Sequence, residues 1–472
     1  MSAPVATTRV LPTMNLDGSR RWIRPKPSHG KFNTRRRVVA YGLMFVFFII
    51  PYIRVAGKPL VLLDLPRREF TFVGVTFLPT DTLLLMLLMA SILIGVFLLT
   101  ALFGRVWCGW SCPQTVYMEF LFRPLERLFE GGRSGSLELD RQGLRGQFRG
   151  RRLAKYATYG VLSLFLTHTF LAYFIGIDQL VVWMQRSPAD HPTSFAIMAL
   201  VSTAIMLNFT WFREQTCLVA CPYGRLQSVL LDRQSLIVAY DVNRGEPRHK
   251  GRTKAEGSGD CVDCNACVIT CPTGIDIRDG LQMECIHCTQ CADACDDIMT
   301  KLERPTGLIR YSSRAALESK HVSKLRPRTV LYPAALSLTF GGFLFALATR
   351  QPADVTVLRG LGAPYAVEGD GQIANQLRVK ITNRTGVAHN YRIVIDSLES
   401  GTMIAPRNPL PVAPGETEVT DMFVMMPASA FQAGEHNVFV KIDDGGKYHE
   451  RIPFRLVGPA GGNGALKQER PQ

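Results

Sequence analysis

The sequence predicts an α-helical membrane protein with a cysteine-rich module and a C-terminal immunoglobulin-like β-sandwich. Three observations indicate this fold class. Five long windows contain no Asp, Glu, Lys or Arg. All 12 cysteines lie between residues 108 and 295, and eight of them form two runs of identical spacing. After residue 350, short stretches alternate apolar and polar residues, as half-buried strands do.

The charge-free windows cover residues 38–53, 82–104, 156–177, 191–212 and 329–349. Four of them have 21 to 23 residues, which as helices can cross a hydrocarbon layer of ~30 Å. The first has only 16 residues, but Arg37 and Arg54 at its ends can extend toward the interface. We therefore expect five transmembrane helices, four within residues 38–212 and the fifth at residues 329–349.

The net charge of +15 lies entirely before residue 350, because residues 350–472 hold 13 basic and 13 acidic side chains. Residues 1–37 and 105–155 carry much of the excess, which is typical of cytoplasmic loops. These segments do not interleave aromatic with basic residues, so we expect no nucleic-acid partner. Residues 1–37 are expected to form a mostly disordered basic arm against membrane lipid headgroups.

Residues 261–295 contain the spacing C-x2-C-x2-C-x3-C twice. A [4Fe–4S] cluster needs four converging thiolates, and in two-cluster ferredoxins the fourth cysteine of each run binds the other cluster. We expect one cluster on Cys261, Cys264, Cys267 and Cys295, and the other on Cys285, Cys288, Cys291 and Cys271. A zinc ribbon, the main alternative, would use two separated C-x2-C pairs. The pattern predicts a two-cluster, bacterial ferredoxin-like domain over residues 257–300.

A second motif, C-x3-C-P, follows the second and fourth windows, with its cysteines at Cys108 and Cys112 and at Cys217 and Cys221. Residues four apart share a helix face, and proline disfavours helical geometry at the residue before it. Two such thiolates can hold a soft ion such as Cu(I), with further ligands from the other pair or from elsewhere. The repetition favours a metal or redox site, and a two-fold internal repeat would bring all four thiols together. A disulfide within a pair is the alternative, which a reducing cytosol opposes.

His168 lies near the middle of the third window. A histidine inside a membrane is costly unless it has a partner, so it is interpreted either as a metal or quinone ligand or as hydrogen-bonded to a nearby carbonyl or Thr167. Methionines in the spans could line a copper path, although such residues more often serve packing.

The remaining segments are a cytoplasmic linker at residues 213–256, a connector at residues 301–328 and the tail at residues 350–472. Six short alternating stretches in the tail predict strands, at residues 354–358, 375–382, 390–395, 418–424, 436–442 and 451–457. This number of strands in about 120 residues suits an immunoglobulin-like sandwich. With a cytoplasmic N-terminus, five spans place the clusters in the reducing cytoplasm and the cysteine-free tail in the periplasm.

These motifs together resemble the FixG/CcoG family, bacterial accessory proteins of cbb3-type cytochrome c oxidase. The resemblance covers nearly the whole chain and rests on residues 107–113, the linker run at residues 231–248 and the two cysteine runs. It implies a location in the bacterial inner membrane and two [4Fe–4S] clusters on the eight cysteines. It also implies reduction of Cu(II) to Cu(I) for oxidase assembly at the four cysteines of the C-x3-C-P motifs.

As partners, the resemblance implies oxidase assembly factors, a copper transporter or chaperone, and a cytosolic electron donor. Two other functions stay open. The chain could conduct electrons between a cytosolic donor and quinone or a periplasmic reductase, as related nitrate and nitrous-oxide polyferredoxins suggest. It could also be a non-enzymatic assembly scaffold with structural clusters.

Overall fold

The computed structural model describes residues 12–15, 17–55, 57–66, 69–78, 81–142, 148–251, 256–318, 326–368, 371–396, 398, 401–446 and 448–459. The chain divides into two compact units, Met1–Leu344 and Phe345–Gln472.

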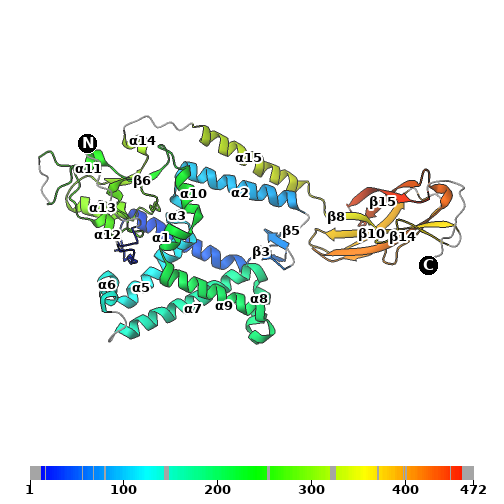
Figure 1. Cartoon of the computed structure of the whole chain (residues 1–472), viewed down its shortest axis with the longest axis horizontal. Helices are drawn as coiled ribbons and strands as arrows, with labels where there is room; N and C mark the ends of the chain where they lie inside the picture. The colour runs from blue at the N-terminus through cyan, green and yellow to red at the C-terminus, as the bar shows by residue number, and fades with distance from the viewer. Residues whose placement is uncertain are drawn as a thin grey trace. The chain divides into compact units, whose positions relative to one another are not determined.

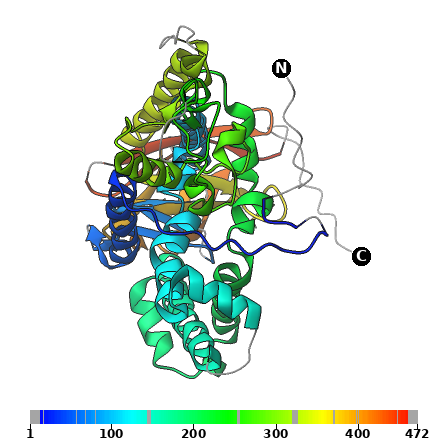
Figure 2. The same cartoon turned by 90° about the vertical axis from the view of Figure 1, so that its left-hand side faces the viewer.

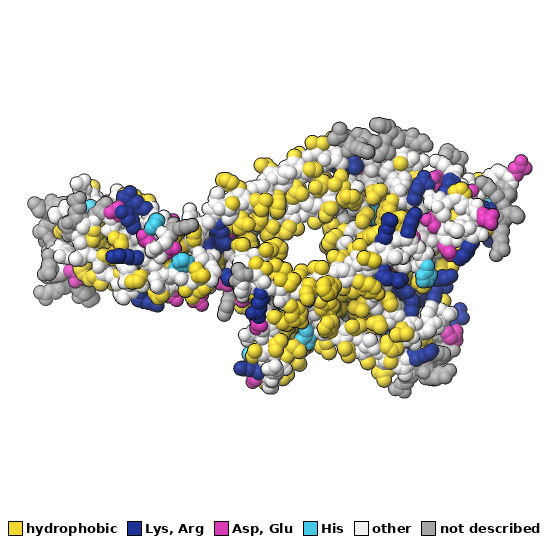
Figure 3. Space-filling view, turned by 180° about the vertical axis from the view of Figure 1, so that it is seen from behind, with side chains coloured by type: hydrophobic (Ala, Val, Ile, Leu, Met, Phe, Trp, Pro, Cys, Tyr) yellow, Lys and Arg dark blue, Asp and Glu magenta, His cyan; other side chains and the backbone are white. Residues whose placement is uncertain are grey.

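Four helices in the described residues are long and apolar enough to cross a membrane: α2 (Thr82–Phe103), α7 (Phe148–Ile175), α9 (Pro192–Leu207), which a π-helical turn extends to Phe212, and α15 (Pro327–Ala348). In the first unit α7 packs beside α9, and α2 lies beside α15 (Figure 1). No more than 33% of each apolar span is buried, so most of these side chains face outward. Figure 3 shows hydrophobic side chains covering these helices and basic side chains gathered near the cysteine-rich module.

The prediction of a fifth span at residues 38–53 is wrong by these criteria. Residues 31–49 form helix α1 (Lys31–Ile49), but Lys31, Arg35, Arg36 and Arg37 occupy its first two turns. Only residues 38–49 of the helix remain free of charge, and 12 residues rise ~18 Å, well short of ~30 Å. A 3₁₀ turn at Ile50–Tyr52 then ends the helix.

The N-terminal arm also differs from the expected disordered segment. Its described residues, 12–15 and 17–30, begin with a turn closed by a bridge between Met14 and Arg20 and then continue mostly without regular secondary structure along the protein (Figure 2, dark blue). The Lys26 N–H donates to the Ile269 carbonyl at 3.1 Å, and the Arg24 guanidinium pairs with Asp140 at 3.0 Å and with Glu126. Arg24 therefore has acidic partners inside the protein in place of lipid headgroups.

Short elements connect the long helices. The segment after α1 forms β1 (Arg54–Val55) with β2 (Lys58–Pro59), and an antiparallel sheet of β3 (Val61–Asp64), β4 (Glu69–Phe72) and β5 (Val75–Phe77). Between α2 and α7 lie α3 (Val106–Trp110), α4 (Pro113–Tyr117), a π-helical turn (Met118–Phe122), α5 (Arg123–Glu130) and α6 (Gly132–Gln142). Helix α8 (Ile177–Met184) precedes α9, and α10 (Pro222–Leu230) follows it.

The cysteine-rich module is small and closed by one pair of strands. Strand β6 (Ile237–Tyr240) pairs antiparallel with β7 (Ile309–Ser312), and between them lie α11 (Val242–Gly245), α12 (Ala266–Ile269), a 3₁₀ turn (Ile277–Asp279) and α13 (Gln290–Lys301). Helix α14 (Arg314–Leu317) follows β7. The pairing of β6 with β7 holds the two cysteine runs in one compact domain.

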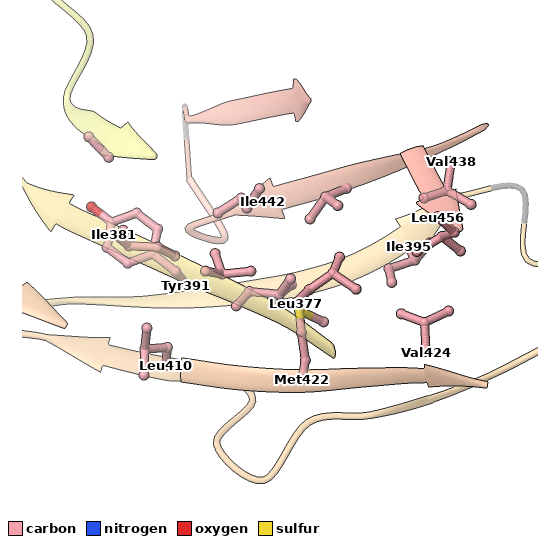
Figure 4. Close-up of a cluster of buried hydrophobic side chains, with 14 of the residues drawn as sticks. Leu377, Ile381, Tyr391, Ile395, Leu410, Met422, Val424, Val438, Ile442 and Leu456 are labelled. Carbon is pink, nitrogen blue, oxygen red and sulfur yellow. The ribbon is translucent and has the colours of Figure 1, made fainter. Parts of the chain in front are cut away.

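The second unit is a sandwich of two antiparallel sheets. One has the order β12-β14-β10-β8 with β9 also on β10, and the other has the order β13-β11-β15-β16. Their bounds are β8 (Ala353–Arg359), β9 (Ala366–Val367), β10 (Gln372–Asn383), β11 (His389–Asp396), β12 (Thr402–Ile404), β13 (Leu410–Val412), β14 (Thr417–Pro427), β15 (Glu435–Asp443) and β16 (His449–Val457). Alternate residues of both sheets, including Leu377, Ile395 and Val438, fill the core (Figure 4). The six predicted strands are confirmed, and β9, β12 and β13 are additional.

Candidate functional site

The first four predicted cluster cysteines surround one small cavity. Cys261, Cys264, Cys267 and Cys295 line it together with Tyr240 and Arg278. Cys264 is exposed, whereas the other three are buried. The cavity thus has one edge at the surface of the module.

The second four surround a separate cavity. Cys271, Cys285, Cys288 and Cys291 line it, and Cys267 reaches it from the first run. Cys285 and Cys288 are buried, and Cys271 and Cys291 are partly buried. The structure therefore gathers the cysteines in the two crossed sets expected from the spacing, with each run sending its fourth cysteine to the other cavity.

The backbone repeats itself between the two runs. Asp263 and Asn265 flank Cys264 with φ of 51° and 57°, and His287 and Thr289 flank Cys288 with φ of 54° and 59°. Alternation between left-handed and ordinary backbone turns successive N–H groups into a concave, anion-binding surface. Both runs thus have a local conformation suited to an anionic centre.

The chemistry of the cavities fits an iron–sulfur cluster. Burial raises the pKa of Cys285 to about 12 and that of Cys288 to about 11, so these thiols ionise at neutral pH only beside a strong cation such as iron. Among the described residues, no three His, Cys, Asp or Glu side chains converge on a single metal ion. A cubane cluster does not require that, because each thiolate binds a different iron.

Each C-x3-C-P motif forms a broken turn. Cys108 lies in α3 and Cys217 in a π-helical turn (Thr216–Ala220), whereas Cys112 and Cys221 are extended, with φ/ψ of −61°/126° and −76°/110°. The proline after each second cysteine then begins α4 or α10. The expected effect of proline is confirmed, but the two thiols of a pair do not share one helix face.

The two turns are structural repeats of one another. Four residues before the first cysteine of each pair, Gly104 has φ/ψ of 60°/−131° and Arg213 has 53°/−121°. Polar side chains join the copies. The Asn208 amide donates to the Gln114 Oε1 at 2.7 Å, and the Gln114 amide donates to the Arg213 carbonyl at 3.0 Å.

This arrangement brings the four thiols into one region. Burial, followed by the neighbouring Cys112, Cys108 and Cys221, raises the pKa of Cys217 to about 12. Burial likewise raises the pKa of Cys108 to about 11, and its thiol donates to the Gln227 Oε1 at 3.1 Å. At neutral pH these thiols are protonated, so a bound cation must displace their protons.

The first turn packs directly on the second cavity. A Cβ added to Gly109, between Cys108 and Cys112, would lie 2.8 Å from the backbone N of Cys288 and 2.6 Å from the Ile286 carbonyl oxygen. The Arg105 N–H donates to His287 Nδ1 at 3.2 Å. Only glycine at position 109 allows this approach of the two backbones.

An aromatic pair reinforces the same junction. The Trp110 indole N–H donates to the Tyr311 hydroxyl at 2.9 Å, which donates to the His287 carbonyl at 2.9 Å. Burial and the nearby Arg105 lower the pKa of His287 to about 3, so His287 is neutral and its Nδ1 can accept the Arg105 bond.

A buried charge network supports the other side of the second cavity. The Arg123 guanidinium donates to the Pro272 carbonyl at 3.3 Å and pairs with Glu119 and Glu214.

Glu126 accepts from Arg213 at 2.8 and 3.0 Å. Burial alone would raise the pKa of Glu126, but Arg213 and Arg24 outweigh it and hold the pKa well below its ordinary value.

His168 lies apart from the thiols, on a cavity of about 260 Å³ between α7, α8 and α9. Its Nδ1 donates to the Leu164 carbonyl at 2.7 Å. Trp183 and His191 line the same cavity, and their rings stack at 4.7 Å. The buried Trp183 Nε1 and His191 Nε2 have no hydrogen-bond partner in the described part of the chain.

Several residues of the junction were not anticipated from the sequence, among them Arg36, Gln227, His287 and Tyr311. One signal was available, because Gly104 and Gly109 flank Cys108 and glycine often marks a close backbone approach. Arg36, Gln227, His287 and Tyr311 come from elements that are distant in sequence, so local spacing could not predict that they meet.

Known protein families match three parts of the chain. Residues 212–314 match a 4Fe-4S dicluster domain, and residues 85–131, which include Cys108 and Cys112, match a 4Fe-4S binding domain. Residues 343–459 match the IG-like fold at the C-terminus of FixG. The cysteine-rich module is therefore an iron–sulfur domain, and the sandwich is of the FixG type.

Full-length relatives agree. The nitrogen fixation protein FixG of Rhizobium meliloti is 31% identical over 94% of this chain and 94% of its own length. Proteins RdxA and RdxB of Cereibacter sphaeroides are 32% and 34% identical, covering 89% and 82% of this chain and 93% and 84% of theirs. With this coverage and the matching domains, the chain belongs to the FixG family, as a membrane-associated iron–sulfur electron-transfer protein.

Proposed function

We propose that this protein reduces Cu(II) to Cu(I) at the C-x3-C-P turns, for assembly of a cbb3-type cytochrome c oxidase. One observation carries the proposal: Gly109, within the Cys108–Cys112 turn, packs on the backbone of Cys288. The second cavity and the candidate copper thiols are thereby nearest neighbours. When bound, two [4Fe–4S] clusters supply one-electron transfer, at potentials that reach about −400 mV and below.

The surrounding residues support a direction of transfer. Cys264 is exposed, so a soluble, low-potential donor protein can dock at the first cavity. The second cavity lies against the turns. Each electron that reaches the thiols converts one cupric ion to a cuprous ion, and soft thiolate sulfur then retains Cu(I).

The charge distribution supports the sidedness that we propose. Basic side chains gather at the end of the first unit that carries the module (Figure 3), which favours a cytoplasmic position by the positive-inside rule. A reducing cytoplasm also suits 12 unpaired cysteines. Helix α15 then leads the chain across the membrane, so we place the sandwich in the periplasm, where it would meet oxidase assembly factors or a copper transporter or chaperone.

The test is anaerobic reduction of added cupric ion by dithionite-reduced protein, with cuprous ion trapped by a coloured chelator. The variant Cys108→Ser/Cys112→Ser should lose copper reduction and keep the iron content and visible absorbance of the parent. Ser111→Ala, in the same turn, is the matched control and should behave as the parent. Copper reduction retained by the double variant would refute the proposed site.

A second candidate function is electron exchange with a membrane quinone, and the cavity beside His168 favours it. An apolar cavity between membrane helices with two unpartnered nitrogens suits a ring that carries oxygen acceptors. Against it, Met198 at this cavity stands 14 residues before Phe212 at the end of the span, ~21 Å along a helix. Reoxidation of the reduced protein by decylubiquinone faster than by cupric ion would favour this alternative.

A further inference from the structure

Arg36 is a charged residue where none is expected. It lies in the second turn of α1 and is fully buried, at 0% exposure, while its neighbours Arg35 and Arg37 are exposed. Arginine is rarely buried unless it is paired, because removing its charge from water is costly.

The guanidinium has few partners. Its Nε donates to the Gly109 carbonyl at 2.9 Å, and the group stands 5.3 Å from the ring centre of Phe120. Both terminal nitrogens are buried without a hydrogen-bond partner, and no carboxylate lies at ion-pair distance among the described residues. Glu119, whose pKa Arg36 helps to lower, already pairs with Arg123, so among the described residues Arg36 has no carboxylate of its own.

The second cavity, where an anionic iron–sulfur cluster would bind, lies close to Arg36. Gly109, which accepts from Arg36, is the same residue that packs on the Cys288 backbone. Helix α1 is fixed against the iron–sulfur domain, because the Asp293 carboxylate accepts from the backbone N–H groups of Phe32 at 3.1 Å and Asn33 at 2.6 Å.

Among the described residues, the first cavity has no equivalent charge. Its arginine, Arg278, pairs with Asp263 and Asp276 at 2.6 Å each. Two carboxylates therefore more than neutralise that guanidinium. The potential of an iron–sulfur cluster depends on nearby charge, on hydrogen bonds to its sulfurs and on exposure. A positive charge stabilises the reduced, more negative form.

We propose that Arg36 raises the reduction potential of the cluster held at the second cavity, and so makes that cluster the electron acceptor of the pair. Arg36 is a positioning residue. Its charge acts on the cluster without contact to the reacting atoms, and its bond to the Gly109 carbonyl holds the first turn in place. The proposal depends on the iron–sulfur assignment and not on copper as the substrate.

The experiment is a redox titration of the anaerobically purified, full-length protein, with each cluster followed by its electron paramagnetic resonance signal. Arg36→Gln should lower the equilibrium constant for one-electron reduction of one cluster at least tenfold, a shift of about 59 mV, and leave the other in place. Arg36→Lys retains the positive charge, so its reduction potential should stay close to that of the parent protein. Arg35→Gln, exposed on the same helix, is the matched control.

If Arg36→Gln does not assemble its clusters, the comparison is made between Glu119→Gln and Glu119→Gln/Arg36→Gln, which removes one charge of each sign. The double variant should show the lower potential. Unchanged potentials, or equal shifts in Arg36→Gln and Arg35→Gln, would overturn the proposal. A selective shift in a protein that does not reduce copper would uphold this inference and refute the proposed function.

Discussion

The two cluster cavities have the same cysteine spacing and the same local backbone, yet their surroundings differ. At the first, Cys264 is exposed and Arg278 is neutralised by two aspartates. At the second, Cys285 and Cys288 are buried, Gly109 packs on the cysteine loop, and Arg36 leaves a charge unpaired. The repeated motif therefore lies in two environments, one open to solvent and one packed against the first C-x3-C-P turn.

This difference indicates how a symmetric ligand set can serve a directional process. The ligands determine which cofactor binds, while neighbouring charge and burial determine its potential and its accessibility. In the proposed function, the exposed cavity receives electrons and the buried cavity passes them to the thiol turns.

The largest expected effect comes from removing one ligand at each cavity. Cys288→Ser and Cys264→Ser should each lower the iron content by about half, because each removes one of four thiolates. Cys288→Ser should reduce copper only at the background rate with any reductant. Cys264→Ser should fail with reduced flavodoxin as the protein donor but keep activity with dithionite. If the two variants behaved alike, the first cavity could not be distinguished as the place where electrons enter, nor the second as the place where they leave.

A smaller effect is expected where the second cavity meets the first turn. In Gly109→Ala the new Cβ would lie 2.6 Å from the Ile286 carbonyl oxygen, so the turn must move away. Displacement of about 1 Å can cost roughly 10²-fold in rate, and we expect slower copper reduction at unchanged iron content. Gly42→Ala, with nothing within 4 Å of its added Cβ, is the control. A parental rate in Gly109→Ala would show that this contact does not couple the sites.

The smallest effect concerns acid and the charge network beside Pro272. The pKa of Glu126 is held below its ordinary value of 4.5. Between that value and the lower pKa of the folded state, the unfolded chain therefore binds a proton that the folded protein does not. This stabilisation is complete above about pH 4.5 and declines as the pH falls toward the folded-state pKa. The melting temperature should therefore fall below that pH, and less steeply in Glu126→Gln. An identical slope in both proteins would mean that other carboxylates govern acid stability.

Much of the candidate site could be predicted from local spacing. The crossed assignment of eight cysteines follows from two runs, and the extended backbone at Cys112 and Cys221 follows from the prolines after them. The sandwich strands follow from strict alternation. The prediction of a fifth span was wrong because the charge-free window did not show where the helix lies. Helix α1 begins at Lys31 and ends at Ile49, so only part of the window is helical. For the described residues of the arm, 12–15 and 17–30, the prediction of disorder was wrong because the acidic partners of Arg24 are distant in sequence.

The sequence by itself determined the ligands, the apolar spans and the strands, because each depends on residues a few positions apart. Only the tertiary structure decided that Gly109 meets Cys288, that the two C-x3-C-P turns lie together and that the two terminal nitrogens of Arg36 are buried without a hydrogen-bond partner among the described residues. Each of these contacts joins segments more than 70 residues apart, as in the bond from Arg36 to Gly109 at a separation of 73. Burial and charge at a site are set by all the elements that pack around it, and local patterns describe only one element at a time.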